Sequence, residues 1–303
     1  MSIFPTKILV ATDGSREAAL PAHTAAQIAD ETSSELHVVY VRPKSVPFHA
    51  GDYVGPEVAE HPLHREEELQ EREAQRVLDA QVEEIEAAGR SVTQTHLGIG
   101  RPDEEIVALG EELEAGLIVV GSRGRGGIRR ALIGSVSDSV VRHAHCPVLV
   151  VRWKPVVFPA KILVATDGSE EAALAAQSAA DLAARTGSEL HVTHVGTALS
   201  HVECMGAVTQ ELLDKEAKEV LEAQLERMGE AGARVTEAHL MSGRADEEII
   251  FRAEQVGADL VVVGSRGLGG VRRALMGSVS DSVVRHAHCP VLLVRREGRQ
   301  EPV

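Results

Sequence analysis

The chain has 303 residues, a formal net charge of −15, and 44% hydrophobic but only 2% aromatic residues. This acidic balance argues against binding to nucleic acid or to anionic membranes, because both depend on clustered lysine and arginine side chains. The scarcity of aromatic residues argues against platforms for base stacking. No run approaches the roughly 18 apolar residues of a membrane span, and no signal peptide is visible, so we expect a cytoplasmic protein.

The first half of the chain alternates between apolar, strand-like runs and longer helical patterns. The expected strands are 8–11, 36–41, 91–97, 117–120 and 147–151, and the expected helices are 17–32, 65–88, 103–114 and 135–144. A loop rich in Pro, Gly and His spans 42–64, and a glycine- and arginine-rich loop spans 121–134. Strands that alternate with helices in this way predict a parallel, doubly wound α/β sheet.

The second half of the chain repeats the first. The sequence KILVATDGS occurs at Lys7–Ser15 and again at Lys161–Ser169, and Val119–Arg152 recurs almost unchanged as Val262–Arg295. This distance exceeds the about 20–50 residues of a solenoid repeat, so we interpret it as a duplicated domain. We predict a first domain over 1–152, a linker over 153–159, a second domain over 160–296 and a C-terminal tail over 297–303.

Three features of each repeat are expected at one edge of the sheet. Asp13 follows the first strand, Val41 ends the second strand, and the glycine-rich loop follows the fourth strand. Ligands of open α/β sheets bind beyond the carboxyl ends of the strands, so this convergence predicts one binding site per domain.

The glycine-rich loop has the composition of an anion cradle. Glycines let backbone N–H groups approach phosphate oxygens, and the helix that begins at Ser135 offers further N–H donors and a positive dipole end. Positive charge comes from Arg123, Arg129 and Arg130. The alternative is a glycine-rich turn with a serine cap and no ligand. Neither a P-loop nor a Rossmann fingerprint fits the spacing of this loop.

On these motifs, the chain resembles a tandem universal stress protein of the ATP-binding subclass. The resemblance rests on ATDGS after the first strand, on Gly-2x-Gly-9x-Gly-Ser after the fourth, and on the closing HCPVLVVR. It implies an adenine nucleotide alpha hydrolase-like fold with two five-stranded sheets of strand order 3-2-1-4-5. It also implies ATP in each cleft, with the participation of Mg left open.

The resemblance also assigns residues to the two sites. Asp13 and Asp167 would contact the ribose or the adenine side of the nucleotide, and Val41 and Val195 would contact adenine through backbone groups. The residues that would hold ribose and phosphates are Gly121, Gly124, Gly134, Ser135 and Val136, and in the second repeat Gly264, Gly267, Gly277, Ser278 and Val279. We expect the sites to differ in affinity because of the loops 42–64 and 196–207, and because Leu268 replaces Arg125.

The family dimerises through its last strand, so the resemblance implies that 148–151 and 291–294 pair within one chain. The chain would then be an internal pseudo-dimer, with a further homodimer left open. Such pairing would hide two exposed sheet edges.

The expected function is ATP binding in a stress response, by nucleotide-dependent binding or signalling, with no nucleic-acid or membrane partner. Two alternatives stay open: a weak ATPase or phosphotransferase, and an interaction module that needs no nucleotide. The sequence shows no catalytic constellation such as a nucleophile elbow. Asp13 and Asp167 have an alternative role as turn residues that cap the next helix. No metal site is expected, because His143 and His145, and likewise His286 and His288, read as cations near a helix end.

Overall fold

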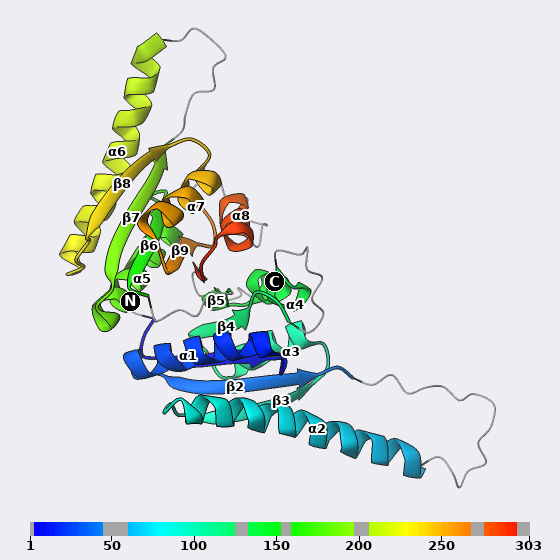
Figure 1. Ribbon diagram of the computed structural model, residues 1–303. Coiled ribbons are helices and arrows are strands. Elements are labelled where there is room, and N and C mark those ends of the chain that lie inside the picture. Colours follow the sequence, from blue (N-terminus) through cyan, green and yellow to red (C-terminus); the bar gives the residue numbers. More distant parts are fainter. Residues whose placement is uncertain are drawn as a thin grey trace.

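The computed structural model describes residues 3–44, 60–124, 133–152, 159–196, 206–267 and 276–295, without the side chains of 60–66 and 206–210. Both repeats fold as alternating strands and helices (Figure 1). The first repeat contains β1 (Lys7–Thr12), the 3-10 helix η1 (Arg16–Ala18), α1 (Ala19–Thr32), β2 (Glu35–Arg42), α2 (Glu60–Ala87), β3 (Gln94–Ile99), α3 (Pro102–Glu112), β4 (Leu117–Gly121), α4 (Ser135–His143) and β5 (Val148–Val151). The second repeat contains β6 (Lys161–Thr166), α5 (Glu170–Thr186), β7 (Glu189–Gly196), α6 (Gly206–Glu230), β8 (Glu237–Ser242), α7 (Ala245–Val256), β9 (Leu260–Gly264), α8 (Ser278–His286) and β10 (Val291–Val294).

All ten strands form one sheet, in the order β3-β2-β1-β4-β5-β10-β9-β6-β7-β8. Pairing within each repeat is parallel, which confirms the expected doubly wound domains and the strand order 3-2-1-4-5. The repeats meet where β10 pairs antiparallel with β5, with Leu292 opposite Leu149. The predicted pairing of the last strands is therefore confirmed within one chain.

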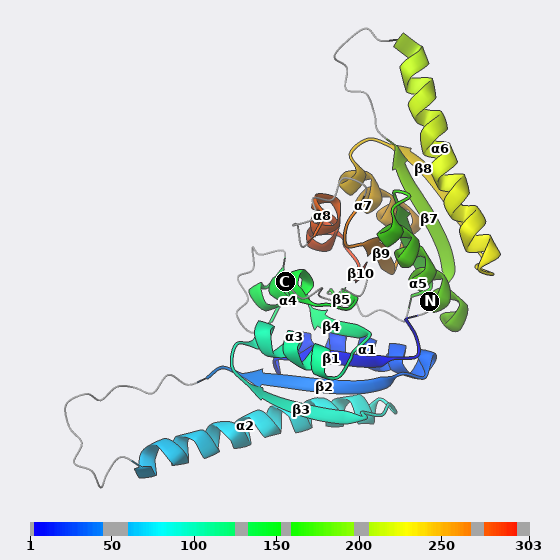
Figure 2. The same ribbon diagram turned by 180° about the vertical axis from the view of Figure 1, so that it is seen from behind.

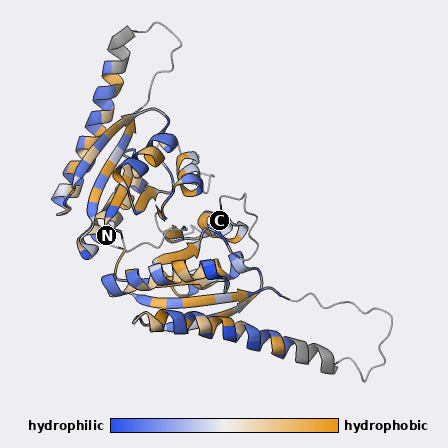
Figure 3. Cartoon of the chain, in the orientation of Figure 1, coloured by the Kyte–Doolittle hydropathy of each residue, from blue (hydrophilic) through white to orange (hydrophobic). Residues whose placement is uncertain are grey.

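The central strands are buried on both faces, as their continuous apolar runs require. In β1 the side chains of Ile8, Leu9 and Val10 are fully buried. One layer of the core lies between the sheet and α1, α2, α5 and α6, and the other lies between the sheet and α3, α4, α7 and α8. Both layers run through the two repeats; Figure 2 shows helices lying on the sheet, and Figure 3 shows apolar and polar residues interspersed along the helices.

Arginines at the ends of the two meeting strands bridge the repeats. The Arg295 guanidinium, after β10, donates hydrogen bonds to the carbonyls of Val141 and Ala144 at the end of α4. Arg152, after β5, donates to the carbonyl of Val284 in α8. The last carbonyls of a helix have no partner within it, so each repeat supplies a cap for a helix of the other.

A second bridge joins α4 to α8. Arg142 donates to Asp281 at 2.7 Å, and Arg285 donates to Asp138. Each arginine also pairs with the aspartate four residues earlier on its own helix. The four side chains form one alternating network across the approximate symmetry axis.

Some element boundaries differ from those expected. Helix α2 begins at Glu60 rather than at 65, and β3 begins at Gln94 rather than at 91. The later start of β3 follows from Thr93. Its N–H donates to the Leu36 carbonyl, but its side-chain hydroxyl, rather than a backbone carbonyl, accepts from the Leu36 N–H. Loop residues 45–59, the linker residues 153–158 and the tail lie outside the described residues. Among the described helices, none combines the length and apolar character that a membrane crossing requires.

Candidate functional site

A pocket opens at the carboxyl ends of the strands in each repeat. The first has a volume of about 560 Å³ and the second about 700 Å³. Both volumes lie within the roughly 300–1,000 Å³ typical of small-molecule sites. The predicted residues that line the first pocket are Asp13, Val41, Gly121, Gly124, Gly134, Ser135 and Val136, and those that line the second are Asp167, Val195, Gly264, Gly267, Gly277, Ser278 and Val279. The structure therefore brings together every predicted residue of each set.

Asp13 lies in the turn that follows β1, and its carboxylate is held from within that turn. Its Oδ1 accepts hydrogen bonds from the Ser15 N–H at 3.0 Å and from the Ser15 hydroxyl at 2.6 Å. Asp167 likewise accepts from the Ser169 N–H at 3.0 Å. The Ser169 hydroxyl instead caps α5 by accepting from the Ala172 N–H at 3.2 Å. The turn fixes each aspartate at the mouth of its pocket.

The glycine-rich loop passes directly against this aspartate. A Cβ on Gly124 would lie 2.3 Å from Asp13 Oδ2, and a Cβ on Gly267 would lie 2.2 Å from Asp167 Oδ2. Real Cβ atoms do not approach that closely, so any larger residue at either position would displace the carboxylate that the glycine covers. The ATDG motif and the glycine loop, which are far apart in the sequence, are thus in contact.

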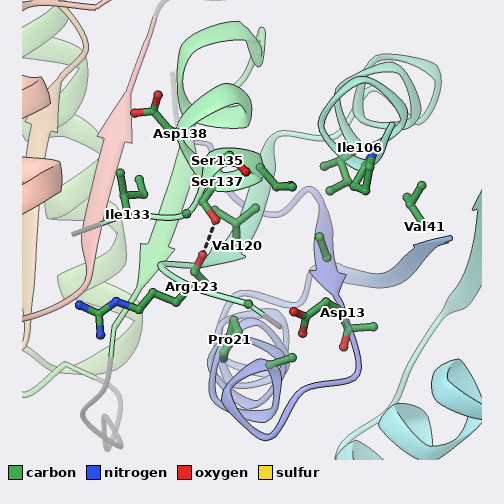
Figure 4. Close-up of a pocket in the computed structure, with 18 of the residues that line it drawn as sticks. Asp13, Pro21, Val41, Ile106, Val120, Arg123, Ile133, Ser135, Ser137 and Asp138 are labelled. Carbon is green, nitrogen blue, oxygen red and sulfur yellow. Dashed lines mark hydrogen bonds between the residues drawn. The ribbon is translucent and has the colours of Figure 1, made fainter. Parts of the chain in front are cut away.

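Helix α4 begins inside the pocket. Gly134 is its N-cap residue, in an extended conformation and without a side-chain hydrogen bond, so Ser135 is the first helical residue rather than the cap. The Ser137 hydroxyl donates to the Gly121 carbonyl at 2.6 Å and fixes the helix start against the end of β4 (Figure 4). In the second repeat Ser280 donates to Gly264 at 2.6 Å. The first N–H groups of a helix lack intrahelical acceptors and carry positive partial charge, which suits an anionic group.

The opposite wall of the first pocket is apolar. Val41, Ile106 and Val120 line it, and Figure 4 shows Val41 and Ile106 across the pocket from Ile133 and Arg123. Val195 and Ile249 hold the same places in the second pocket. Each pocket therefore combines an apolar side, suited to a flat ring, with a polar side formed by the loop and the helix start.

The two pockets differ in side chains that the sequence analysis did not single out. Arg285 of the second repeat lines the first pocket, together with Asp138. Thr193 lines the second pocket where Val39 lines the first, and His194 also lines the second pocket, whereas Tyr40 at the equivalent position is not part of the first. Aligning the two repeats could have identified Thr193, since strand alternation places it on the same face as Val195. Arg285 could not be identified, because its role depends on how the repeats pack.

Several predicted contributors cannot be placed. Arg129 and Arg130, and the pair Arg125 and Leu268 that we expected to distinguish the sites, lie outside the described residues. Arg123 is described and lines the first pocket, and Arg266 lines the second. Figure 4 shows the Arg123 side chain directed away from Asp13.

Burial and neighbouring cations lower the pKa of the bridging arginines. Burial lowers the pKa of Arg295 to about 10, and Arg266 adds to that effect. Burial also lowers the pKa of Arg152, with a further contribution from Arg123. Each pocket arginine is thus electrostatically coupled to an arginine that caps a helix of the other repeat.

Comparisons with known proteins agree with this geometry. The model of the Universal stress protein family matches residues 5–152 and 160–295. A universal stress protein of Mycobacterium tuberculosis is 34% identical over 219 residues, covering 71% of this chain and 72% of the relative. The crystal structure of a universal stress protein from Archaeoglobus fulgidus superposes with a TM-score of 0.68 at 27% identity and covers 99% of both chains. A functionally unknown protein from Pseudomonas aeruginosa shares the fold, with a TM-score of 0.63 at 21% identity, over 96% of this chain and 92% of that one.

Proposed function

Because the chain belongs to the universal stress protein family, we propose that it binds an adenine nucleotide, ATP in the first instance, in both pockets. The observation that carries this proposal is the repeated convergence of a held aspartate, a glycine loop and an uncapped helix start around a pocket of suitable size. The convergence occurs in both repeats, although the side chains of their second strands differ.

The residues fit the parts of a nucleotide. The apolar wall at Val41 and Val195 would take the adenine ring, and the aspartates at 13 and 167 would take ribose hydroxyls. The phosphates would lie against the N–H groups of the loop and of α4 or α8, where glycines leave room for close backbone approach. Mg²⁺, when it accompanies ATP, would supply charge neutralisation of the phosphates.

The geometry favours binding over turnover. Asp13 Oδ1 already accepts two hydrogen bonds from Ser15, which suits a positioning carboxylate better than a general base. We propose that nucleotide occupancy changes which partner the protein binds during stress. The pocket reaches the inter-repeat network through Asp138 and Arg285, which supplies a physical route for such a change. We further propose that the two domains span 1–152 and 160–296 and that the protein is cytoplasmic.

The proposal is tested by titrating ATP into nucleotide-free protein in a calorimeter. Gly124→Ala should abolish binding in the first pocket and Gly267→Ala in the second, because the added Cβ displaces the aspartate. The double variant should bind no ATP. Gly229→Ala is the matched control, since no atom lies within 4 Å of a Cβ there. Full binding by the double variant would contradict the proposal, and release of ADP and phosphate over time would favour the ATPase alternative.

A further inference from the structure

Two buried histidines of the second repeat face each other at the end of the sheet away from the pocket. The Nδ1 atom of His191, on β7, lies 3.2 Å from the Nε2 atom of His239, on β8, and the rings are stacked with an interplanar angle of 5°. His191 lies opposite Glu237 in the strand register, and His239 lies two residues farther along, so all three side chains share one face of the sheet. His191 is two residues before Thr193, the nearest residue of β7 that lines the pocket on this face, which is about 7 Å along the strand.

Glu237 completes a group of metal-ligand type. One ligand atom from each of His191, His239 and Glu237 lies within 4.8 Å of the other two. The His191 Nδ1 atom is 3.8 Å from Glu237 Oε2. Two ligand atoms at a tetrahedral zinc ion are about 3.4 Å apart, given zinc–ligand distances of about 2.0–2.1 Å. The two imidazole nitrogens already have about this separation, and the exposed Glu237 carboxylate would move closer to complete the group.

Charged side chains beside the two histidines affect how well they can bind a metal ion. The Nε2 atom of His191 lies 3.5 Å from Glu189 Oε2, and the tautomer with its hydrogen on Nε2 has the Nδ1 lone pair facing His239 and Glu237. Carboxylates behind a ligating histidine orient the ring in this way at metal sites. Burial, and then the charge of Arg252, lowers the pKa of His239. Arg252 is also a positive charge that opposes a bound cation.

The first repeat supplies a natural comparison. His37 and His96 make the same contact at 3.0 Å, and Glu35 lies behind His37 at 3.4 Å. Gln94 holds the place of Glu237 there, so the first repeat has the histidine pair without the third anionic ligand.

From this difference, we propose that His191, His239 and Glu237 form a zinc site that is separate from the nucleotide pocket. Three protein ligands leave one coordination position for water, and the exposed position of Glu237 gives access to solvent. The first repeat lacks such a site because Gln94 cannot supply the carboxylate.

The test is a titration of Zn²⁺ against a chromophoric chelator, with the full chain stripped of metal and free of nucleotide. The parent should bind one zinc ion tightly. Glu237→Gln should weaken that binding by more than about tenfold, and Glu189→Gln by about tenfold. Glutamine at 237 should not disturb folding, since the first repeat carries Gln94 at that place, and circular dichroism checks this.

Two further variants sharpen the test. Gln94→Glu should create a second tight site in the first repeat, and Arg252→Leu, which copies Leu109, should tighten zinc binding by removing the opposing charge. Co²⁺ in place of Zn²⁺ should give visible absorption bands that disappear in the Glu237→Gln variant. Parent and Glu237→Gln proteins with equal zinc affinity, or a Gln94→Glu protein with no added site, would overturn the proposal.

Discussion

At one position of the second strand, the two pockets differ by a single hydroxyl group. Thr193 is fully buried and lines the second pocket, whereas Val39 occupies that position in the first. Within the described part of the chain, the Thr193 hydroxyl has no hydrogen-bond partner. A buried hydroxyl without a partner costs roughly 1–3 kcal/mol, so the site is destabilised unless a ligand or a water molecule bonds to it.

Thr193→Val should therefore have opposite effects on stability and on binding. Without nucleotide, the variant should be about 1 kcal/mol more stable to urea, because valine fills the same space and removes the unpaired group. ATP binding in the second pocket should weaken while the first pocket is unaffected. Thr32→Val is the control: its buried hydroxyl donates to the Ile28 carbonyl at 2.5 Å, so this variant should lose stability. A Thr193→Val protein that is destabilised and binds ATP normally would show that the hydroxyl has a partner within the protein.

The lowered pKa of Asp281 predicts how the stability of the junction between the repeats changes in acid. Burial opposes its ionisation, but hydrogen bonds and charges from Arg285 and Arg142 lower its pKa below the ordinary value. A carboxyl group with a lowered folded pKa contributes stability that is present above its unfolded pKa of about 3.9 and is lost as pH falls through the folded value.

Asp281→Asn should accordingly lower the free energy of unfolding at pH 7 by about 1 kcal/mol, the scale of a partly exposed ionic network. The difference from the parent should shrink as the pH falls below about 4, where the unfolded parent takes up the proton, and should be lost below the lower folded pKa. Urea unfolding at a series of pH values measures both effects. Asp79→Asn, on the exposed face of α2, should show no such pH-dependent difference. A constant difference at all pH values would mean that charge on Asp281 is not the cause.

At the scale of elements, the arginines that follow β5 and β10 hold helices of the opposite repeat. Arg295→Met should destabilise the chain by about 2 kcal/mol, because the carbonyls of Val141 and Ala144 lose charged donors inside the junction. Arg72→Met, which removes an exposed pair with Glu68 on α2, should change stability by less than about 0.5 kcal/mol. Equal effects of the two substitutions, measured by urea unfolding, would contradict the capping role of Arg295.

The order of strands and helices could be predicted because each element has a local signal. Apolar runs mark β1 and β4, and the repeat gives every element a second reading in the other half. The residues that line the pockets could also be predicted, because they lie at or just beyond the carboxyl ends of strands. The predicted starts of α2 and β3 were wrong, because a propensity pattern does not show which hydrogen bonds form just before a helix or strand.

Other features could not be predicted because they depend on tertiary contacts. Nothing in the local sequence shows that Arg285 reaches the pocket of the other repeat, or that His191 and His239 meet. The histidines are far apart in the chain, and the alternation pattern alone does not give the register between β7 and β8. The approach of Gly124 to Asp13 likewise requires the fourth strand to lie beside the first.

For the whole molecule, the central strand pair makes two domains into one continuous sheet. Both layers of the core extend across this junction. Phe4, near the start of the chain, is buried, and its carbonyl accepts a hydrogen bond from Arg185 of the second repeat. An isolated first repeat would expose the edge of β5 and the apolar side chains around it.

We therefore predict that a chain ending at residue 152 self-associates. It should form a homodimer in which β5 pairs with its own copy, because the antiparallel β5–β10 pairing joins two closely similar sequences. Size-exclusion chromatography with light scattering would measure its mass. A stable, well-folded monomer would show that the strand edge needs no partner.

The central claim is that one chain carries two working nucleotide sites. Protein purified without added nucleotide, then denatured, should release close to two adenine nucleotides per chain, or should bind two when ATP is added back. Chromatography of the released nucleotide against the protein concentration gives this ratio directly. A chain that releases no nucleotide, and that binds none at millimolar ATP while remaining folded, would contradict the account.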